Sequence, residues 1–222
     1  YSSQFGNKMS GVLNLKSLEP SDETQYSVGA SFINARAGAQ GGFANGKGTW
    51  LVSARRGYLD MILKAMDDET NKFEPIYADA YGKMSYQLND EHEVTASLLY
   101  AFDDEIYDDK IVNADGYIDE KKKISGKYSS SYFWLSLNSQ WNDKLTSTII
   151  VSAGAIDEDR KGDNFKPYEV DILVDDYKKF TFVELKQDWK YRFSNDQIWQ
   201  WGLDLKSLDA EYRYMSKNWF SQ

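Results

Sequence analysis

The chain has 222 residues and a formal net charge of −9 at pH 7, with 41% hydrophobic residues and no cysteine. The acidic balance offers no basic surface for phosphates and argues against nucleic acid as a partner. The absence of cysteine excludes disulfides, thiol catalysis and cysteine-based zinc sites. No stretch approaches about 18 consecutive apolar residues, which excludes a transmembrane helix. A mean hydropathy of −0.63 suits a soluble protein, but also a membrane barrel whose strands show one polar face.

The N-terminal part of the sequence predicts three strands joined by two small turns. The first strand covers residues 24–33 and ends in a turn at residues 34–36. The second, glycine-rich strand covers residues 37–44, and a turn at residues 45–48 leads into a third strand at residues 50–60. Asparagine and glycine suit such turns because they tolerate left-handed backbone angles.

The remainder of the sequence repeats one unit: an alternating segment, a short polar turn and a second alternating segment. In the first of these units, Val94, Ala96 and Leu98 alternate with Thr95 and Ser97, the period of a pleated strand. The three units comprise residues 77–88, 89–92 and 93–102; residues 127–141, 142–144 and 145–156; and residues 179–193, 194–196 and 197–208.

The predicted strands are long, and their connections alternate between short and long. Segments of about 11 to 14 residues exceed the usual length of about 5–6 in soluble sheets. A tilted membrane-spanning strand needs about 9–11 residues. Long connections at residues 61–76, 104–126 and 157–178 are expected to be external loops, and aromatic residues gather near the strand ends. The pattern predicts an all-β fold, an antiparallel transmembrane β-barrel, whereas a soluble β-sandwich would explain the alternation alone.

Three stretches of sequence resemble the TonB-dependent receptors of the outer membrane. Residues 1–16 read YSSQFGNKMSGVLNLK and are similar to the segment that closes the plug domain of this family, with Gly6, Gly11 and a short apolar strand. Residues 50–60 are similar to an early barrel strand with the pattern S-x-R-R-x-Y-L-D, and residues 77–86 resemble the strand that follows. The stretches occur in the family's order, so the resemblance covers essentially the whole chain.

The resemblance implies a domain organisation and a function. Residues 1–20 would be the C-terminal end of the plug, and residues 21–222 the first roughly nine strands of a 22-stranded barrel. The remaining strands and most of the plug are expected to lie outside this sequence. The implied function is ligand uptake across the outer membrane of a Gram-negative bacterium. A siderophore, a vitamin, a glycan and a peptide all remain open as the ligand.

The resemblance also implies partners. These are outer-membrane lipid and lipopolysaccharide, a small-molecule or oligomeric ligand, and the TonB complex, which acts through the plug region. Two alternatives remain: a passive outer-membrane porin, and a soluble β-sandwich binding module. Lumen-facing polar residues are expected on the barrel wall, among them Gln87, Glu184, Lys186, Asp204 and Lys206.

Acidic residues between positions 103 and 120 form the densest candidate site. Carboxylates gathered in an external loop can bind Ca²⁺ or a cationic ligand. Residues 113–119 resemble the middle of a calcium loop, but Ile111 and Lys122 would occupy its first and twelfth positions, so an EF-hand is excluded. No metal site or cofactor is predicted. The candidate ligand-binding residues are Asp104, Glu105, Asp108, Asp109, Asp115 and Asp119.

Two further features concern charge and catalysis. Arg55 and Arg56 are adjacent in a predicted strand, so their side chains should lie on opposite faces, one of them against the plug. His92 is the single histidine, lies in a predicted turn and has no serine or cysteine nucleophile in its surroundings. The sequence therefore predicts that the protein is not an enzyme.

Overall fold

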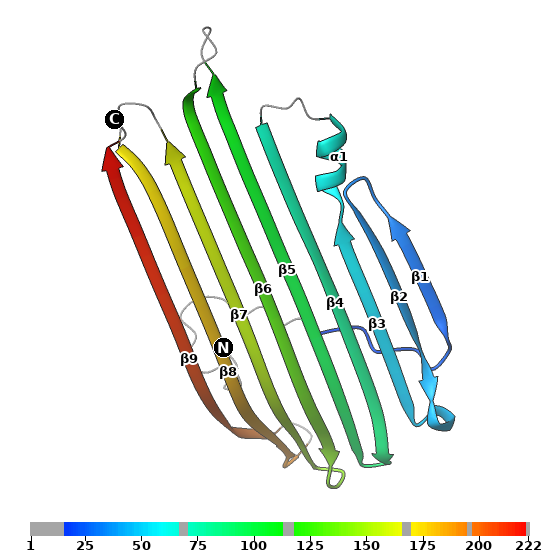
Figure 1. The fold of residues 1–222 in the computed structure, drawn as a ribbon. Helices are drawn as coiled ribbons and strands as arrows, with labels where there is room; N and C mark the ends of the chain where they lie inside the picture. Colours follow the sequence, from blue (N-terminus) through cyan, green and yellow to red (C-terminus); the bar gives the residue numbers. More distant parts are fainter. Residues whose placement is uncertain (1–15, 67–70, 113–117, 166–169, 195–196, 221–222) are drawn as a thin grey trace.

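The computed structural model describes residues 16–66, 71–112, 118–165, 170–194 and 197–220. These residues form one antiparallel sheet of nine strands in which each strand pairs with the next along the chain (Figure 1). The predicted all-β antiparallel fold is confirmed. The strands are β1 (Gln25–Ala30), β2 (Asn34–Phe43), β3 (Gly48–Gly57), β4 (Asn71–Asn89), β5 (His92–Val112), β6 (Ile118–Gln140), β7 (Leu145–Phe165), β8 (Val170–Arg192) and β9 (Ile198–Phe220).

The sheet is a single open layer. Figure 1 shows the short strands β1 to β3 at one side and the long strands β4 to β9 at the other. A 3-10 turn, η2 (Ala44–Gly46), joins β2 to β3, and helix α1 (Leu59–Met66) lies beside β4. Within the described residues, β1 pairs only with β2 and β9 only with β8, so the sheet is not closed. No helix among these residues has the length and apolar character needed to cross a membrane.

The turns predicted at residues 89–92 and 142–144 lie where the sequence predicts them. Asn142 Oδ1 accepts hydrogen bonds from the backbone N–H groups of Lys144 (2.9 Å) and Leu145 (3.0 Å). Asn89 Oδ1 accepts one from the N–H of Glu91 at 2.9 Å. These side chains stabilise the turns by the local bonding that favours asparagine there. At the third turn Ser194 is described, and residues 195–196 lie outside the described residues.

The boundaries near the N-terminus differ from the prediction. Residues 34–36 belong to β2, and the first turn lies at residues 31–33, where the Ser31 hydroxyl accepts the N–H of Asn34 at 3.1 Å. A serine can form such a turn without asparagine or glycine. Residues 58–60 leave the predicted third strand, and Leu59 begins helix α1. Leu59, Ile62 and Leu63 have helical spacing, which places their side chains on one face.

The expected long loops are largely strand. Strands β4 to β9 have 19 to 23 residues each and extend through most of the regions predicted as external loops. In the extensions of β5 to β8, cross-strand charge pairs join the strands, such as Asp108 opposite Lys123 and Glu158 opposite Lys178. Opposite charges that face each other across a ladder stabilise it. The sheet therefore continues as a polar extension, without an apolar face.

Candidate functional site

The sheet separates apolar from polar side chains onto two faces. We call the face that bears Val94, Ala96 and Leu98 the apolar face, and the face that bears Thr95 and Ser97 the polar face. The cross-strand register carries this division across all nine strands. Among the described residues no hydrophobic side chain is buried. The exposed large side chains of the apolar face include Val52, Met84, Leu98, Phe133, Leu135, Val151, Val183, Leu185, Leu203 and Leu205.

This apolar face is too extensive for water. Soluble monomers rarely expose contiguous apolar patches larger than a few hundred Å². Here the patch runs from β3 to β9, and Val151 in its middle is 43% exposed between Leu135 and Leu185 of the neighbouring strands. Because none of the residues that the structure describes forms a second layer over this face, an apolar surrounding is the simplest way to remove it from water.

Stacked aromatic rings border the apolar band on the side of the short turns. Trp189 stacks between Trp141 and Trp201, with ring centroids 6.1 and 6.2 Å apart, and His92 meets Trp141 edge-on at 5.4 Å. The Trp141 indole N–H donates a hydrogen bond to the Ser147 hydroxyl at 2.8 Å. Such rings, apolar but with a polar group, suit the boundary between lipid and water.

A second aromatic level lies farther along β5, where Tyr100 and Phe102 pack at 6.2 Å. The distance from His92 to Phe102 is about 34 Å along the strand at about 3.4 Å per residue. With the tilt of about 45° that membrane strands adopt, this becomes about 24 Å across the bilayer. That agrees with the height of about 25 Å of the apolar band of outer-membrane barrels.

Several charged and hydroxyl side chains of the polar face pair with one another. Lys206 pairs with Glu184 at 3.5 Å, and Lys186 lies opposite Asp204, so these four residues share the polar face. Ser85 and Thr95, both buried, share a hydrogen bond of 2.9 Å. Aromatic rings also lie on this face, including Tyr81 with Trp134 at 6.1 Å and Tyr132 with Phe182 at 6.2 Å. The alternation of hydropathy gave no indication of these rings.

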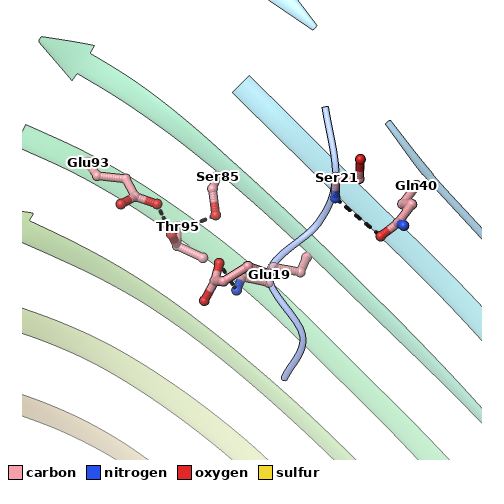
Figure 2. A network of polar contacts seen from close by, with 7 residues as sticks. Glu19, Ser21, Gln40, Ser85, Glu93 and Thr95 are labelled. Carbon is pink, nitrogen blue, oxygen red and sulfur yellow. Dashed lines mark hydrogen bonds and ion pairs between the residues drawn. The ribbon is translucent and has the colours of Figure 1, made fainter. Parts of the chain in front are cut away.

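The segment at residues 16–24 crosses the polar face from β4 to β1, as Figure 2 shows at close range. Glu19 pairs with Lys83 at 2.8 Å, and the Lys83 side chain is buried. The N–H of Ser21 donates to Gln40 Oε1 at 3.3 Å, and the N–H of Gly42 donates to the carbonyl of Asp22 at 2.8 Å. These contacts hold the segment on the polar face of the sheet.

No family model, no curated protein and no solved structure matches this chain. The interpretation of the two faces therefore rests on their residues and geometry alone.

The predicted ligand-binding carboxylates do not form one cluster. Asp104 and Asp108 lie in β5 on the side of the apolar face, whereas Glu105 and Asp109 lie on the opposite side. Asp104 pairs with Lys127 at 3.7 Å. Their predicted place in a loop is wrong, because cross-strand lysines continue the ladder there. Asp115 lies outside the described residues, as does the side chain of Asp119.

Several of these acidic groups have local partners. Asp109 accepts a hydrogen bond from the Tyr107 hydroxyl at 3.0 Å, and this bond, with partial burial, raises the pKa of Tyr107. Within the described ranges no group of three or more potential metal ligands converges. Binding of a ligand by these carboxylates stays a prediction.

Arg55 and Arg56 lie on opposite faces, which confirms the expectation from their alternation. Arg55 pairs with Asp79 at 2.6 Å on the polar face. Arg56 lies on the apolar face between Ala35 and Ala78, and in the described part of the chain it has no ion-pair partner. His92 is the first residue of β5, at the aromatic border.

A charge network joins β7 and β8 beyond the apolar band. Arg160 contacts Glu158 at 2.9 Å and Asp176 at 2.8 Å, and Lys178 contacts Asp176 at 3.2 Å. Burial alone would raise the pKa of Asp176, but hydrogen bonds from Lys178 and Arg160 outweigh it, so its pKa is lowered. The hydrogen bond to Asp176 raises the pKa of Arg160. These ion pairs link β7 to β8 and stabilise the extension.

Acid is expected to open this part of the β7–β8 hairpin. Because the pKa of Asp176 is lowered in the folded state, its contribution is complete above the ordinary pKa of about 3.9. That contribution is lost as the pH falls through the lower, folded value. The protection of the amides at residues 158–165 and 170–178, taken relative to the intrinsic exchange rate at each pH, should therefore fall steeply below about pH 4. The Asp176→Asn variant should already exchange faster at pH 7, and its exchange should show no further loss of protection near pH 4. If the loss of protection near pH 4 stays unchanged in this variant, Asp176 is not the group that causes it.

Proposed function

We propose that this chain is part of the β-barrel wall of a TonB-dependent outer-membrane receptor that takes up a ligand. The observation that carries the proposal is the apolar face of nine adjacent strands, exposed and bordered by stacked aromatic rings. In the proposed arrangement this face contacts lipid and the polar face lines the lumen. The short turns then lie in the periplasm, and the polar extensions of β4 to β9 rise above the outer leaflet.

The crossing segment favours a receptor with a plug over a passive porin. Residues 16–24 lie on the polar face and continue directly into β1, as expected where a plug in the lumen joins the first barrel strand. The Glu19–Lys83 pair and the bond between Gly42 and Asp22 fasten this junction to the wall. A porin has no need for a segment held in this position.

The outer edges of β1 and β9, which pair with no other strand among the described residues, support a larger barrel. In lipid, an unpaired strand edge leaves backbone N–H and C=O groups without partners, each at a cost of several kcal/mol. We infer that these edges pair with further strands of a barrel of about 22 strands. The ligand then enters from outside past the polar extensions, and the TonB complex acts on the plug.

Gel mobility of the native protein from an outer-membrane fraction, with and without boiling, tests the barrel. A closed barrel should resist SDS until heated, and its mobility should then change at a mass well above 25.6 kDa, that of the present chain. Recovery in the soluble fraction without a mobility change would contradict the membrane assignment and favour the β-sandwich module.

Capture of the full-length protein by the purified periplasmic domain of TonB tests whether the barrel is a TonB-dependent receptor or a passive porin. Capture is expected to increase when the receptor holds its ligand, because ligand binding alters the plug. A heat-modifiable barrel that TonB never captures would contradict the receptor and favour a passive porin.

A further inference from the structure

The apolar face has a groove that extends from β1 to β5. Its volume is about 480 Å³. In one cross-strand row the residues run Val28, Ala37, Ala54, Ala80 and Tyr100, from β1 to β5. The outer two side chains are large and exposed, at 89% and 44%, and the three between them are methyl groups. In this row, Val28 and Tyr100 therefore form the two sides of the groove. The alanine side chains between them form its floor.

One end of the groove has a cation. In the adjoining row, Arg56 lies between Ala35 and Ala78, and Ala78 faces Phe102 across the β4–β5 ladder. Arg56 therefore lies at the level of the outer aromatic residues Tyr100 and Phe102. In the proposed membrane arrangement this is the level of the lipid headgroups in the outer leaflet.

Arg56 has no ion-pair partner within the described residues. The carboxylate that lines the groove, that of Asp79, belongs to a polar-face residue and pairs with Arg55 at 2.6 Å. A guanidinium beside a lipid-facing alanine floor loses part of its hydration, so an anionic partner at the same depth would stabilise it. Arginine forms bidentate hydrogen bonds with phosphate oxygens in a fixed planar geometry. The row from Val28 to Tyr100 and the adjoining row with Arg56 therefore form an apolar groove. At one end of this groove, the Arg56 guanidinium can bind a phosphate.

We propose that this groove binds a phosphate-bearing lipid of the outer leaflet, with acyl chains on the alanine floor and the phosphate on Arg56. The inference rests on the proposed function, because it requires the apolar face to lie in a membrane. An apolar floor with a cation at headgroup depth is the combination that a phosphate-bearing lipid requires, and a protein partner seated there is an outcome that the test below distinguishes.

Native mass spectrometry of the full-length receptor, titrated with diphosphorylated lipid A, tests the site. Arg56→Gln should weaken lipid A binding about tenfold or more, the equivalent of one charge-assisted contact. Ala54→Leu keeps the cation but raises the floor between the walls, and it should weaken binding as well. Lys127→Gln is the matched control. It also removes an exposed cation from the apolar side of the sheet, but Lys127 already pairs with Asp104, so lipid A affinity should stay unchanged.

The outcomes separate this site from the proposed function. Unchanged lipid A affinity in Arg56→Gln, with the heat-dependent mobility intact, overturns the lipid site and leaves the barrel standing. Equal binding of a diacylglycerol without phosphate overturns it too, as does a receptor dimer that Ala54→Leu dissociates. A wild-type receptor found only in the soluble fraction overturns both proposals.

Discussion

Replacing Val151 with arginine is expected to reduce the amount of folded protein in the outer membrane at least tenfold. Val151 lies in the middle of the apolar face between Leu135 and Leu185. An arginine near the bilayer midplane costs a transmembrane barrel about 2–4 kcal/mol, which corresponds to a roughly 30- to 1000-fold change in the folding equilibrium. The heat-modifiable band in an outer-membrane fraction measures the effect.

The next residue along the strand provides the control. Ser152 lies on the polar face, opposite Glu184, where an arginine can remain hydrated and meet an opposite charge. Ser152→Arg should leave the heat-modifiable band within about twofold of the wild type. Equal losses in the two variants would contradict the assignment of the faces to lipid and lumen.

Replacing Gly42 with valine is expected to release the crossing segment from the wall. A Cβ atom at Gly42 would lie 2.7 Å from the backbone carbonyl oxygen of Asp22 and 3.1 Å from its Cα. These are backbone atoms that cannot rotate away, so the segment must move and the bond between Gly42 and Asp22 is lost. Overpacking of this kind costs about 1–3 kcal/mol.

Amide hydrogen exchange in residues 16–24 measures this release. The exchange rate should rise about tenfold for each 1.4 kcal/mol by which the docking of the segment is weakened. Gly82→Val is the matched control, since nothing lies within 4 Å of a Cβ atom at Gly82, on the apolar face. That variant should exchange like the wild type. Unchanged exchange in Gly42→Val would mean that the segment is not held at this position.

The sequence predicts the central strands well because two local signals agree there. The alternation of Val94, Ala96 and Leu98 with Thr95 and Ser97 defines the faces, and Asn89 and Asn142 form the turns through their own side chains. Beyond the apolar band the alternation ends, and the strands persist through pairs such as Asp108 with Lys123. A charge pair across a ladder depends on register, which single-strand periodicity does not contain.

The functional surfaces were predictable to different degrees. Opposite placement of Arg55 and Arg56 follows from strand geometry alone. The groove next to Arg56 does not, because its floor combines alanines from β2, β3 and β4 that are far apart in the sequence. The same limit applies to the Glu19–Lys83 pair. The carboxylates of β5 were grouped by their closeness in sequence, whereas strand alternation sends them to both sides of the sheet.

The strict neighbour-to-neighbour order of the nine strands bears on how the protein is assembled. Each ladder joins segments adjacent in the chain, so each hairpin closes a short loop, and such local contacts form quickly. The Glu19–Lys83 contact is the exception, with a sequence separation of 64 residues. Residues 16–24 are made before the strands they cross, yet they can dock only after β4 has joined the sheet. The earliest described segment of the chain is thus among the later ones to reach its native position.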